Sequence, residues 1–442
     1  MNMKNYKNNI LLPLFLAVVS MVNAQVVLTK EDAIKIALEN NYGVQVAKNN
    51  LEIAKNNSSV LNTGYIPTVS ANAGANYNNS NQDVEFQDGQ SRSVNGAETK
   101  TYNASVSLNY TIFDGLGRKY NYKRLKETYN LTELQARETI ENMYLQLFNL
   151  YFQVARLSKN TENLKEALKI SKQRLLRAKY QYDYGQSTKL EWLNAEVDVN
   201  NDSINLVNSQ QQLHNAKRDL NVVLGVKRSI EYGVETEVDF KNIISFDELV
   251  NRAKENNVLL NQFEKNLAIS ELNLKVSKAN YLPRAGITTS YGWNRSDNPP
   301  TSFLAAATST GLNAGVNFSW NIFDGGTTKT QIANAKITIE NQEILKAQQL
   351  DILENTLKNT YESYLNALFV LEAQDKNLMT NRDNFSRTEE RYKLGQVTSI
   401  EFRQAQINLL NAQNALNNAM YDAKLLELEL YQLSGEILNM DI

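Results

Sequence analysis

The 442-residue chain has no cysteine and only one histidine, His214. Without thiols it can form no disulfide and hold no thiolate-bound metal, and a single histidine leaves little scope for histidine-based catalysis. The other residues offer no carboxylate pair, serine triad or cluster of metal ligands. The sequence therefore predicts a protein that is not an enzyme, with no cofactor and no metal site.

Proline and net charge are also scarce. Five prolines in the whole chain permit long uninterrupted helices. The 46 basic and 48 acidic residues leave a net charge of -2 without a basic run, so no nucleic-acid partner is expected. Beyond the N-terminus, no stretch is apolar enough to be a transmembrane helix.

The first 24 residues have the pattern of a secretory signal peptide. Lys4 and Lys7 precede an apolar run over residues 10–19, and Val22-Asn23-Ala24 is a suitable cleavage site. The alternative is a membrane anchor, but the apolar run is shorter than the roughly 20 residues that span a bilayer. We therefore expect residues 1–24 to be removed on export.

The remaining chain contains an internal duplication. Ile112-Phe113-Asp114-Gly115 recurs as Ile322-Phe323-Asp324-Gly325, and Gly225 recurs as Gly435 at the same offset of 210 residues. A fixed offset over more than a hundred residues indicates two copies of one structural unit.

Each copy has the same predicted order of elements. The first copy covers residues 25–230, with a helix at 29–62, strands at 67–78 and 101–113, a long helix at 115–182 and a helix at 189–224. The second copy covers residues 231–442, with a helix at 246–280, strands at 284–293 and 312–323, a long helix at 325–392 and a helix at 398–435. Each long helix would extend for about 100 Å. We expect two shorter helices to stack end to end beside it, as in a coiled coil or long bundle.

The four expected strands alternate between apolar and small polar residues. Val106 and Leu108, for example, alternate with Ser107 and Asn109, so that the strand has one apolar and one polar face. The apolar face could pack on a protein core, or it could contact lipid while the polar face lines a water-filled lumen. Strand lengths of about 10 residues and aromatic residues near the strand ends favour lipid.

Four strands cannot close a barrel in a membrane. Bacterial outer-membrane barrels have at least about 8 strands, and open sheet edges are not tolerated in lipid. The chain would therefore have to pool its strands with those of one or two further copies. The polar loops at 79–100 and 294–310 would face the outside of the cell, while the helices would lie in the periplasm. Within the second loop, the segment 302–308 is apolar, unlike the residues around it.

These features together resemble the TolC family of outer-membrane efflux proteins over the whole mature chain. The resemblance rests on the duplication, on the strand-to-helix corners and on two paired turns that precede the last helix of each copy. The corners are Phe113-Asp114-Gly115 and Phe323-Asp324-Gly325, and the turns are Tyr182-x-x-Gly185-x-x-Thr188 and Tyr392-x-x-Gly395-x-x-Thr398.

The resemblance implies a mainly α fold with a transmembrane β-barrel portion. Long antiparallel coiled-coil helices and four strands per chain would form a closed barrel and tunnel only as a homotrimer. The implied function is a passive exit duct in the outer membrane for a tripartite efflux pump or a type I secretion system. An inner-membrane transporter would supply the energy, and a periplasmic adaptor protein would dock at the helical turns. The alternative is a secreted or periplasmic coiled-coil scaffold without a transport role, and the sequence does not identify a cargo.

Two acidic residues beside the turns are candidates for the periplasmic aperture. Glu191 and Glu401 fit capping boxes with Thr188 and Thr398. The resemblance also places acids of this region in a ring of like charges at the closed mouth. Gln404 stands where relatives often carry a second acid, so the ring in this chain would have less negative charge.

Basic residues at the same end have two interpretations. Arg391 and Arg403 could be solvated helix surface, or they could latch the mouth shut by bridging to Glu191 or Glu401. The latch is the functional hypothesis for these two side chains.

The remaining motif residues have simple backbone roles. Gly185 and Gly395 are expected to end helices in a left-handed conformation, where the resemblance implies close approach by the adaptor. Asp114 and Asp324 are expected to cap the long helices at the strand-to-helix corners.

Overall fold

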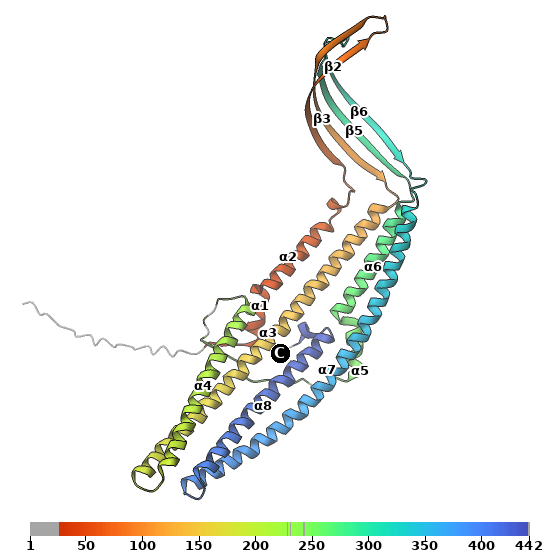
Figure 1. Ribbon diagram of the computed structural model, residues 1–442. Coiled ribbons are helices and arrows are strands. Elements are labelled where there is room, and N and C mark those ends of the chain that lie inside the picture. The colour runs from red at the N-terminus through yellow and green to blue at the C-terminus, as the bar shows by residue number, and fades with distance from the viewer. Residues whose placement is uncertain (1–25, 228, 230, 242–243, 441–442) are drawn as a thin grey trace, which may run out of the picture.

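A computed structural model describes residues 26–227, 229, 231–241 and 244–440. The predicted signal peptide, residues 1–24, lies outside the described residues. Long helices form an elongated bundle, and a curved β-sheet extends from one end of it (Figure 1). The predicted fold class, mainly helical with a small strand portion, is confirmed.

The two halves of the chain repeat one order of elements. The first half contains α1 (Lys30–Asn40), α2 (Tyr42–Asn57), β2 (Thr68–Glu85), β3 (Ser91–Phe113), α3 (Gly117–Asp183) and α4 (Lys189–Leu224). The second half contains α5 (Phe246–Asn256), α6 (Val258–Ala279), β5 (Arg284–Asp297), β6 (Ala306–Ser319), α7 (Thr327–Lys393) and α8 (Ser399–Leu433). The short strands β1 (Val26–Leu28) and β4 (Tyr232–Val234) pair in parallel, and single 3-10 turns cover Val60–Asn62 and Ile437–Asn439.

The two 67-residue helices, α3 and α7, form the long axes of the bundle. α4 packs along the half of α3 that points away from the sheet, and α2 packs along the other half (Figure 1). α8 and α6 flank α7 in the same way. The expected stacking of two shorter helices beside each long helix is therefore present. Among the described residues, no helix combines the length and apolarity needed to cross a membrane.

The first helix of each half is broken, which corrects the single helices predicted at 29–62 and 246–280. The breaks fall at Asn41 and Asn257, whose backbones are extended. The side-chain oxygen of each asparagine caps the following helix. The side-chain amide of Asn41 donates to the Val223 carbonyl at the end of α4, and that of Asn257 donates to the Leu433 carbonyl at the end of α8. A capping asparagine replaces the backbone hydrogen bonds that would continue the helix, and apolar spacing alone does not reveal such a break.

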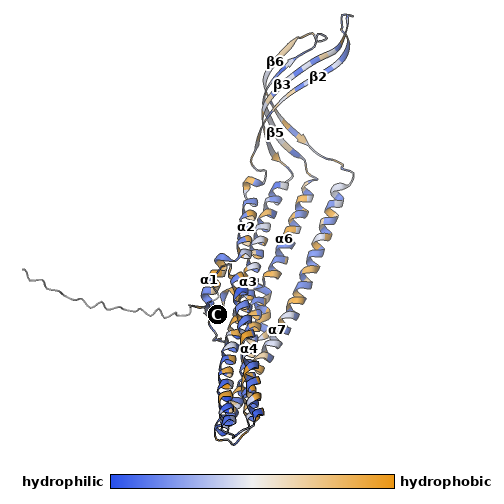
Figure 2. Ribbon diagram, turned by 60° about the vertical axis from the view of Figure 1, so that its left-hand side comes forward, coloured by the Kyte–Doolittle hydropathy of each residue, from blue (hydrophilic) through white to orange (hydrophobic). Residues whose placement is uncertain are grey.

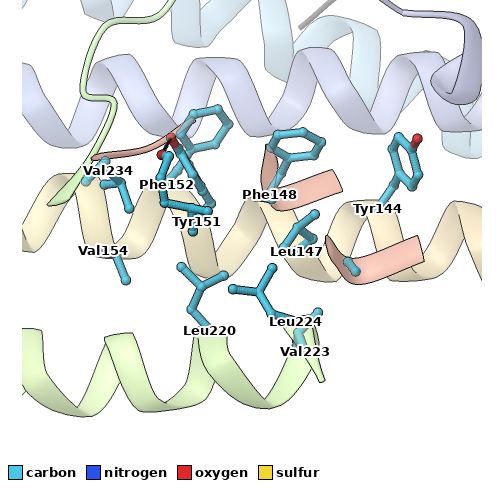
Figure 3. Close-up of a cluster of buried hydrophobic side chains, with 14 of the residues drawn as sticks. Tyr144, Leu147, Phe148, Tyr151, Phe152, Val154, Leu220, Val223, Leu224 and Val234 are labelled. Atoms are coloured by element: carbon cyan, nitrogen blue, oxygen red, sulfur yellow. Dashed lines mark hydrogen bonds between the residues drawn. The ribbon is translucent and has the colours of Figure 1, made fainter. Parts of the chain in front are cut away.

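The main core lies halfway along the helices, where hydrophobic residues gather (Figure 2). Tyr151 and Phe152 of α3 are buried between α4 and α8, and Leu220 and Leu224 of α4 point toward α3 (Figure 3). The Tyr151 hydroxyl donates to the carbonyl of Leu28 in β1 at 2.7 Å. Burial raises the pKa of that hydroxyl. This core determines where along α3 the shorter helices α2 and α4 meet end to end. It thereby fixes the positions of the sheet and of the helical tips relative to each other.

The long strands form an antiparallel sheet in the order β2-β3-β5-β6. β2 and β3 are longer than predicted, because pairing continues through residues 79–100 as far as Glu85 and Ser91, past an irregularity between Ser80 and Gln82. β6 is shifted along the chain and runs from Ala306 to Ser319 rather than from residue 312 to residue 323. β5 extends to Asp297 rather than to residue 293, so the loop predicted at 294–310 is confined to residues 298–305. β2 and β6 therefore form the two free edges of the sheet in the single chain.

Candidate functional site

The two turns at the helical tips adopt the predicted left-handed conformation. Gly185 and Gly395 have φ of 69° and 75°. The amide of Gly185 donates to the carbonyl of Tyr182 at 2.9 Å, and that of Gly395 donates to the carbonyl of Tyr392 at 3.1 Å. Each long helix therefore ends at a residue with positive φ, whose amide donates a hydrogen bond to a carbonyl of the last helical turn. No other heavy atom lies within 4 Å of where a Cβ would stand on either glycine, so both turns are open to solvent.

At the second turn, the predicted capping box is confirmed. Thr398 accepts the amide of Glu401 at 3.2 Å, and the Glu401 carboxylate accepts the Thr398 amide at 2.7 Å. The backbone and side-chain hydrogen bonds from Thr398 lower the pKa of Glu401, with a smaller contribution from the charge of Arg391. Glu401 therefore remains ionised, and it is exposed. Gln404 is also exposed and donates to Asn408 at 2.8 Å.

At the first turn, the predicted capping box is wrong. The Thr188 side chain makes no capping hydrogen bond. Ser187 instead donates its hydroxyl to the Glu191 carboxylate at 2.5 Å. Ser187 thus takes the place of Thr188 as the hydrogen-bond partner of Glu191. The two turns share a sequence pattern but differ in their hydrogen bonds.

Each turn tyrosine stacks on an aromatic residue of the following helix. The rings of Tyr182 and Trp192 lie 5.5 Å apart, and those of Tyr392 and Phe402 lie 4.6 Å apart. The guanidinium of Arg177 lies over the Tyr392 ring, 4.8 Å from the ring centre. Trp192 and Phe402 are related by the repeat offset of 210 residues, and this correspondence is the signal in the sequence for the two stacks. These stacks hold the tips in a fixed shape.

A buried ion pair joins α8 to α4 beyond the tips. Arg403 donates to both carboxylate oxygens of Asp202 at 2.7 Å, and Asp202 is only 3% exposed. Asp202 also accepts the hydroxyl of Ser171 of α3 at 2.5 Å. Burial opposes the charge of Arg403, but Asp202 and then Asp198 outweigh it and raise the pKa of the guanidinium. Arg403 therefore pairs with these aspartates within the chain, and not with Glu191 or Glu401 as the sequence interpretation proposed.

A second arginine extends the same network. Arg174 of α3, which is almost fully buried, pairs with Asp198 of α4 and donates to the carbonyl of Ser399 in α8 at 3.3 Å. The α3–α4 pair and α8 are therefore tied together by two arginines and two aspartates, three of which are buried or nearly so. Arg391, in contrast, is exposed. Sequence reasoning missed Asp198 and Asp202, because charged residues on a long helix are usually solvated.

The strand-to-helix corners confirm the predicted aspartate caps. Asp114 accepts the amide of Arg118 at 2.8 Å, and Asp324 accepts the amide of Thr328 at 2.8 Å. Hydrogen bonds from Thr328 lower the pKa of Asp324. Gly115 and Gly325 both have positive φ, while Phe113 and Phe323 are exposed in the single chain.

The sheet has one face of small polar residues and one of larger apolar residues, and the two kinds alternate along the strands in Figure 2. Successive rows across the four strands of the polar face are Ser70-Ser107-Ser290-Asn313, Asn72-Ser105-Gly292-Gly311 and Gly74-Asn103-Asn294-Ser309. Rows of the other face are Val69-Leu108-Thr289-Ala314, Ala71-Val106-Tyr291-Leu312 and Ala73-Ala104-Trp293-Thr310. None of these rows contains a charged residue.

A groove of about 1000 Å³ runs between α3 and the α7–α8 pair above the tips. Its apolar lining includes Leu168, Phe385 and Leu409, and its charged lining includes Glu162 and Lys169. The groove lies close to the helical tips and combines an apolar lining with charged residues.

Comparison with known proteins gives one consistent result. The family described as outer membrane efflux protein matches residues 33–226 and 249–436. The outer membrane protein TolC of Vibrio cholerae is 20% identical over 385 residues, which are 85% of this chain and 84% of that protein. The toluene efflux pump outer membrane protein TtgC of Pseudomonas putida is 21% identical, over 92% of this chain and 82% of that protein. The crystal structure of the Campylobacter jejuni CmeC outer membrane channel has a similar fold, with a TM-score of 0.75, 16% identity and coverage of 92% of this chain and 85% of that one.

Proposed function

Because the chain belongs to the outer membrane efflux protein family, we propose that this outer-membrane channel protein is the passive exit duct of a tripartite efflux pump or a type I secretion system. Its helices lie in the periplasm. The duct itself does no covalent chemistry, and an inner-membrane transporter supplies the energy. The alternative of a scaffold without a transport role is not favoured, because the family is one of efflux channels.

One observation carries the proposal that three copies assemble. The sheet has only four long strands, and β2 and β6 leave both of its edges unpaired. Open edges are not tolerated in lipid, so β6 of one chain pairs with β2 of the next until a barrel closes. Three copies give twelve strands, with the polar rows lining the lumen and the apolar rows facing lipid.

Exposed apolar residues on the helices support the same assembly. They follow helical spacing on α4 and α7, and large apolar stripes on a soluble surface usually mark an interface. They include Leu190, Leu193, Val197, Ile204 and Val207 on α4, and Ile337, Ile344, Ile352, Phe369 and Met379 on α7. In a trimer, α4 of one chain packs beside α7 of its neighbour, and the helices enclose a tunnel.

Assembly and transport can be tested on the purified full chain. In detergent it should migrate as a trimer that becomes a monomer on heating, and it should fractionate with the outer membrane. Deleting the gene should raise the accumulation of an exported dye, and the wild-type gene should reverse that effect. A protein that is monomeric without heating and is found in the soluble fraction would contradict the proposed exit duct and favour the alternative of a coiled-coil scaffold.

The assignment of the two sheet faces predicts the outcome of a matched pair of substitutions. Val316→Arg would place a charge on the lipid side and should destabilise the barrel by about 2 to 4 kcal/mol. Asn317→Arg, on the neighbouring residue, would place the same charge in the lumen and should cost far less, because water reaches it there. The measurement is the yield of heat-sensitive trimer in the outer membrane. Equal yields for the two variants would contradict the assignment.

The proposed orientation places the β2–β3 hairpin outside the cell and the turns in the periplasm. Gln87, in that hairpin, and Gln186, in the first turn, are both exposed glutamines at opposite ends of the molecule. Because the chain has no cysteine, each can be replaced by a single reactive thiol. Gln87→Cys should react with an impermeant maleimide on intact cells, whereas Gln186→Cys should react only after the outer membrane is breached. The reverse pattern would invert the topology.

The turns and the groove above them are the proposed docking region for the periplasmic adaptor. The turn residues are Tyr182, Gly185, Thr188, Tyr392, Gly395 and Thr398. Threefold symmetry would also bring three copies each of Glu191 and Glu401 to the mouth, where they would attract cations. We assign the latch that keeps this mouth closed to Arg403 and its aspartate partners, because they tie neighbouring helix pairs together beside the tips.

A further inference from the structure

The loop between β5 and β6 exposes large apolar side chains at the end of the sheet farthest from the helices. In this loop, residues 298–305, Phe303 is 92% exposed and Leu304 is 55% exposed. The loop is nevertheless well ordered by its own hydrogen bonds. The Asn298 amide donates to the Ala305 carbonyl at 2.9 Å, and the Asn298 side chain donates to the Leu304 carbonyl at 3.0 Å. The loop thus holds two adjacent large apolar side chains in an exposed position, where they are available to contact a partner.

Contacts with β2 show on which face of the sheet the loop lies. Thr301 donates its hydroxyl to the side chain of Gln82 at 2.6 Å. Gln82 is on β2 and the loop follows β5, so this hydrogen bond crosses over β3, which lies between them. Ala97 of β3 is 1% exposed at this level. Because side chains alternate along a strand, Ala97 belongs to the same face as Asn103, which is the polar face.

A second contact places the loop on the same face. Arg92 of β3 donates to the carbonyl of Pro300 at 2.8 Å. Arg92 lies opposite Val84, two residues beyond Gln82 on β2, so alternation also puts Arg92 on the polar face. The part of the β2–β3 hairpin that extends past β5 and β6 (Figure 1) thus holds the loop from two strands.

Barrel geometry determines how far such a loop reaches. Twelve strands at a spacing of about 4.8 Å and a tilt of about 40° give a backbone radius of about 12 Å. A chain layer packed on the inside of a sheet lies about 10 Å from it. Three loops on the polar face therefore fill most of the lumen at this level, and their exposed side chains meet near the axis.

We propose that the three 298–305 loops of the trimer close the outer mouth of the barrel with an apolar constriction made by Phe303 and Leu304. The inference rests on the proposed trimeric duct, and the partner of each loop is the same loop in the two other copies. An apolar constriction excludes water and hydrated ions by dewetting. The duct then has a second closure at its outer end, which cargo passes by displacing apolar side chains. This closure also gives a role to the loop part of the apolar segment predicted at 302–308, since residues 306–308 belong to β6.

Thiol cross-linking tests the constriction without requiring the periplasmic mouth to open. Phe303→Cys introduces the only thiol in the chain, and Val316→Cys places one on the lipid face as a matched control. Oxidation of intact cells, or a short bifunctional maleimide, should convert most Phe303→Cys chains to a covalent dimer under denaturing conditions. Val316→Cys should remain monomeric. Trimer formation is scored in parallel by heat-sensitive migration.

The outcomes separate this inference from the proposed function. A normal trimer in which Phe303→Cys stays monomeric would overturn the constriction and leave the duct intact, whereas absence of a trimer would overturn both. The positioning contacts are tested in the Phe303→Cys background. Arg92→Ala with Thr301→Val should reduce the cross-linking yield by about fivefold or more, since two hydrogen bonds are lost. Arg295→Ala removes an arginine that pairs with Asp297 on the other face and should not change the yield. A yield insensitive to all three substitutions would show that these contacts do not place the loop.

Discussion

Replacing Arg403 with methionine is expected to open the periplasmic mouth and raise the single-channel conductance several-fold. The substitution leaves the Asp202 carboxylate buried, with Ser171 as its remaining donor. Removing one partner of a buried ion pair costs about 3 to 5 kcal/mol, because the other charge stays out of water. The closed arrangement of α4 against α8 carries this penalty in each chain, and threefold symmetry repeats it. The open mouth relieves the penalty, since water then reaches Asp202.

Two variants control for the loss of a positive charge. Arg391→Met removes an exposed arginine twelve residues earlier in the chain and should change conductance little, because exposed charges contribute about 0 to 1 kcal/mol. Arg403→Met combined with Asp202→Leu removes both members of the pair and should recover much of the closed state, since well-packed apolar residues replace buried ion pairs without loss. The measurements are conductance in planar bilayers and sensitivity of cells to large antibiotics. If Arg403→Met forms normal trimers and has the same conductance as wild type, Arg403 and its aspartate partners do not hold the mouth closed.

The large elements of the fold were predictable, because they depend on patterns that one segment carries by itself. A long run without proline predicts α3 and α7, and alternation along residues 101–113 predicts β3. The glycines at 185 and 395 mark turns whatever surrounds them. Such local signals also revealed the duplication, which fixed the order of elements in both halves.

Features that depend on two distant segments were not predictable. Asp202 looks like helix surface in the sequence, and only the crossing of α8 buries it beside Arg403. Ser187 displaces Thr188 as the partner of Glu191 through the geometry of one turn. The break at Asn41 arises because its amide finds the Val223 carbonyl at the end of α4, 182 residues away. The pattern of residues within one segment does not reveal contacts between segments that are far apart in the sequence.

Gly435→Ala is expected to destabilise the helical bundle far more than Gly395→Ala, although the two glycines have the same φ of 75°. At Gly395 an added Cβ meets no other heavy atom within 4 Å, so alanine adds only the cost of the left-handed conformation, about 1 to 2 kcal/mol. At Gly435 the Cβ would lie 2.3 Å from the backbone carbonyl oxygen of Asn256, which cannot move away on its own.

The reason lies in the joint where α8 ends against the break between α5 and α6. Arg137 of α3 donates to the carbonyls of both Asn256 and Gly435, at 3.2 and 2.7 Å, and pairs with Glu141, which is 1% exposed. Separating the two carbonyls to admit a methyl group removes these hydrogen bonds and strains a buried carboxylate. We therefore expect a total cost above about 4 kcal/mol, in the range that only core disruption or buried charge reaches. The midpoint of the loss of helical circular dichroism on heating measures the difference, and Gly225→Ala with Gly185→Ala repeats the comparison in the first half. Similar midpoints for Gly435→Ala and Gly395→Ala would show that the backbone at Gly435 and Asn256 can move apart at little cost. The close contact between these two residues would then not stabilise the packing of α8 against α5 and α6.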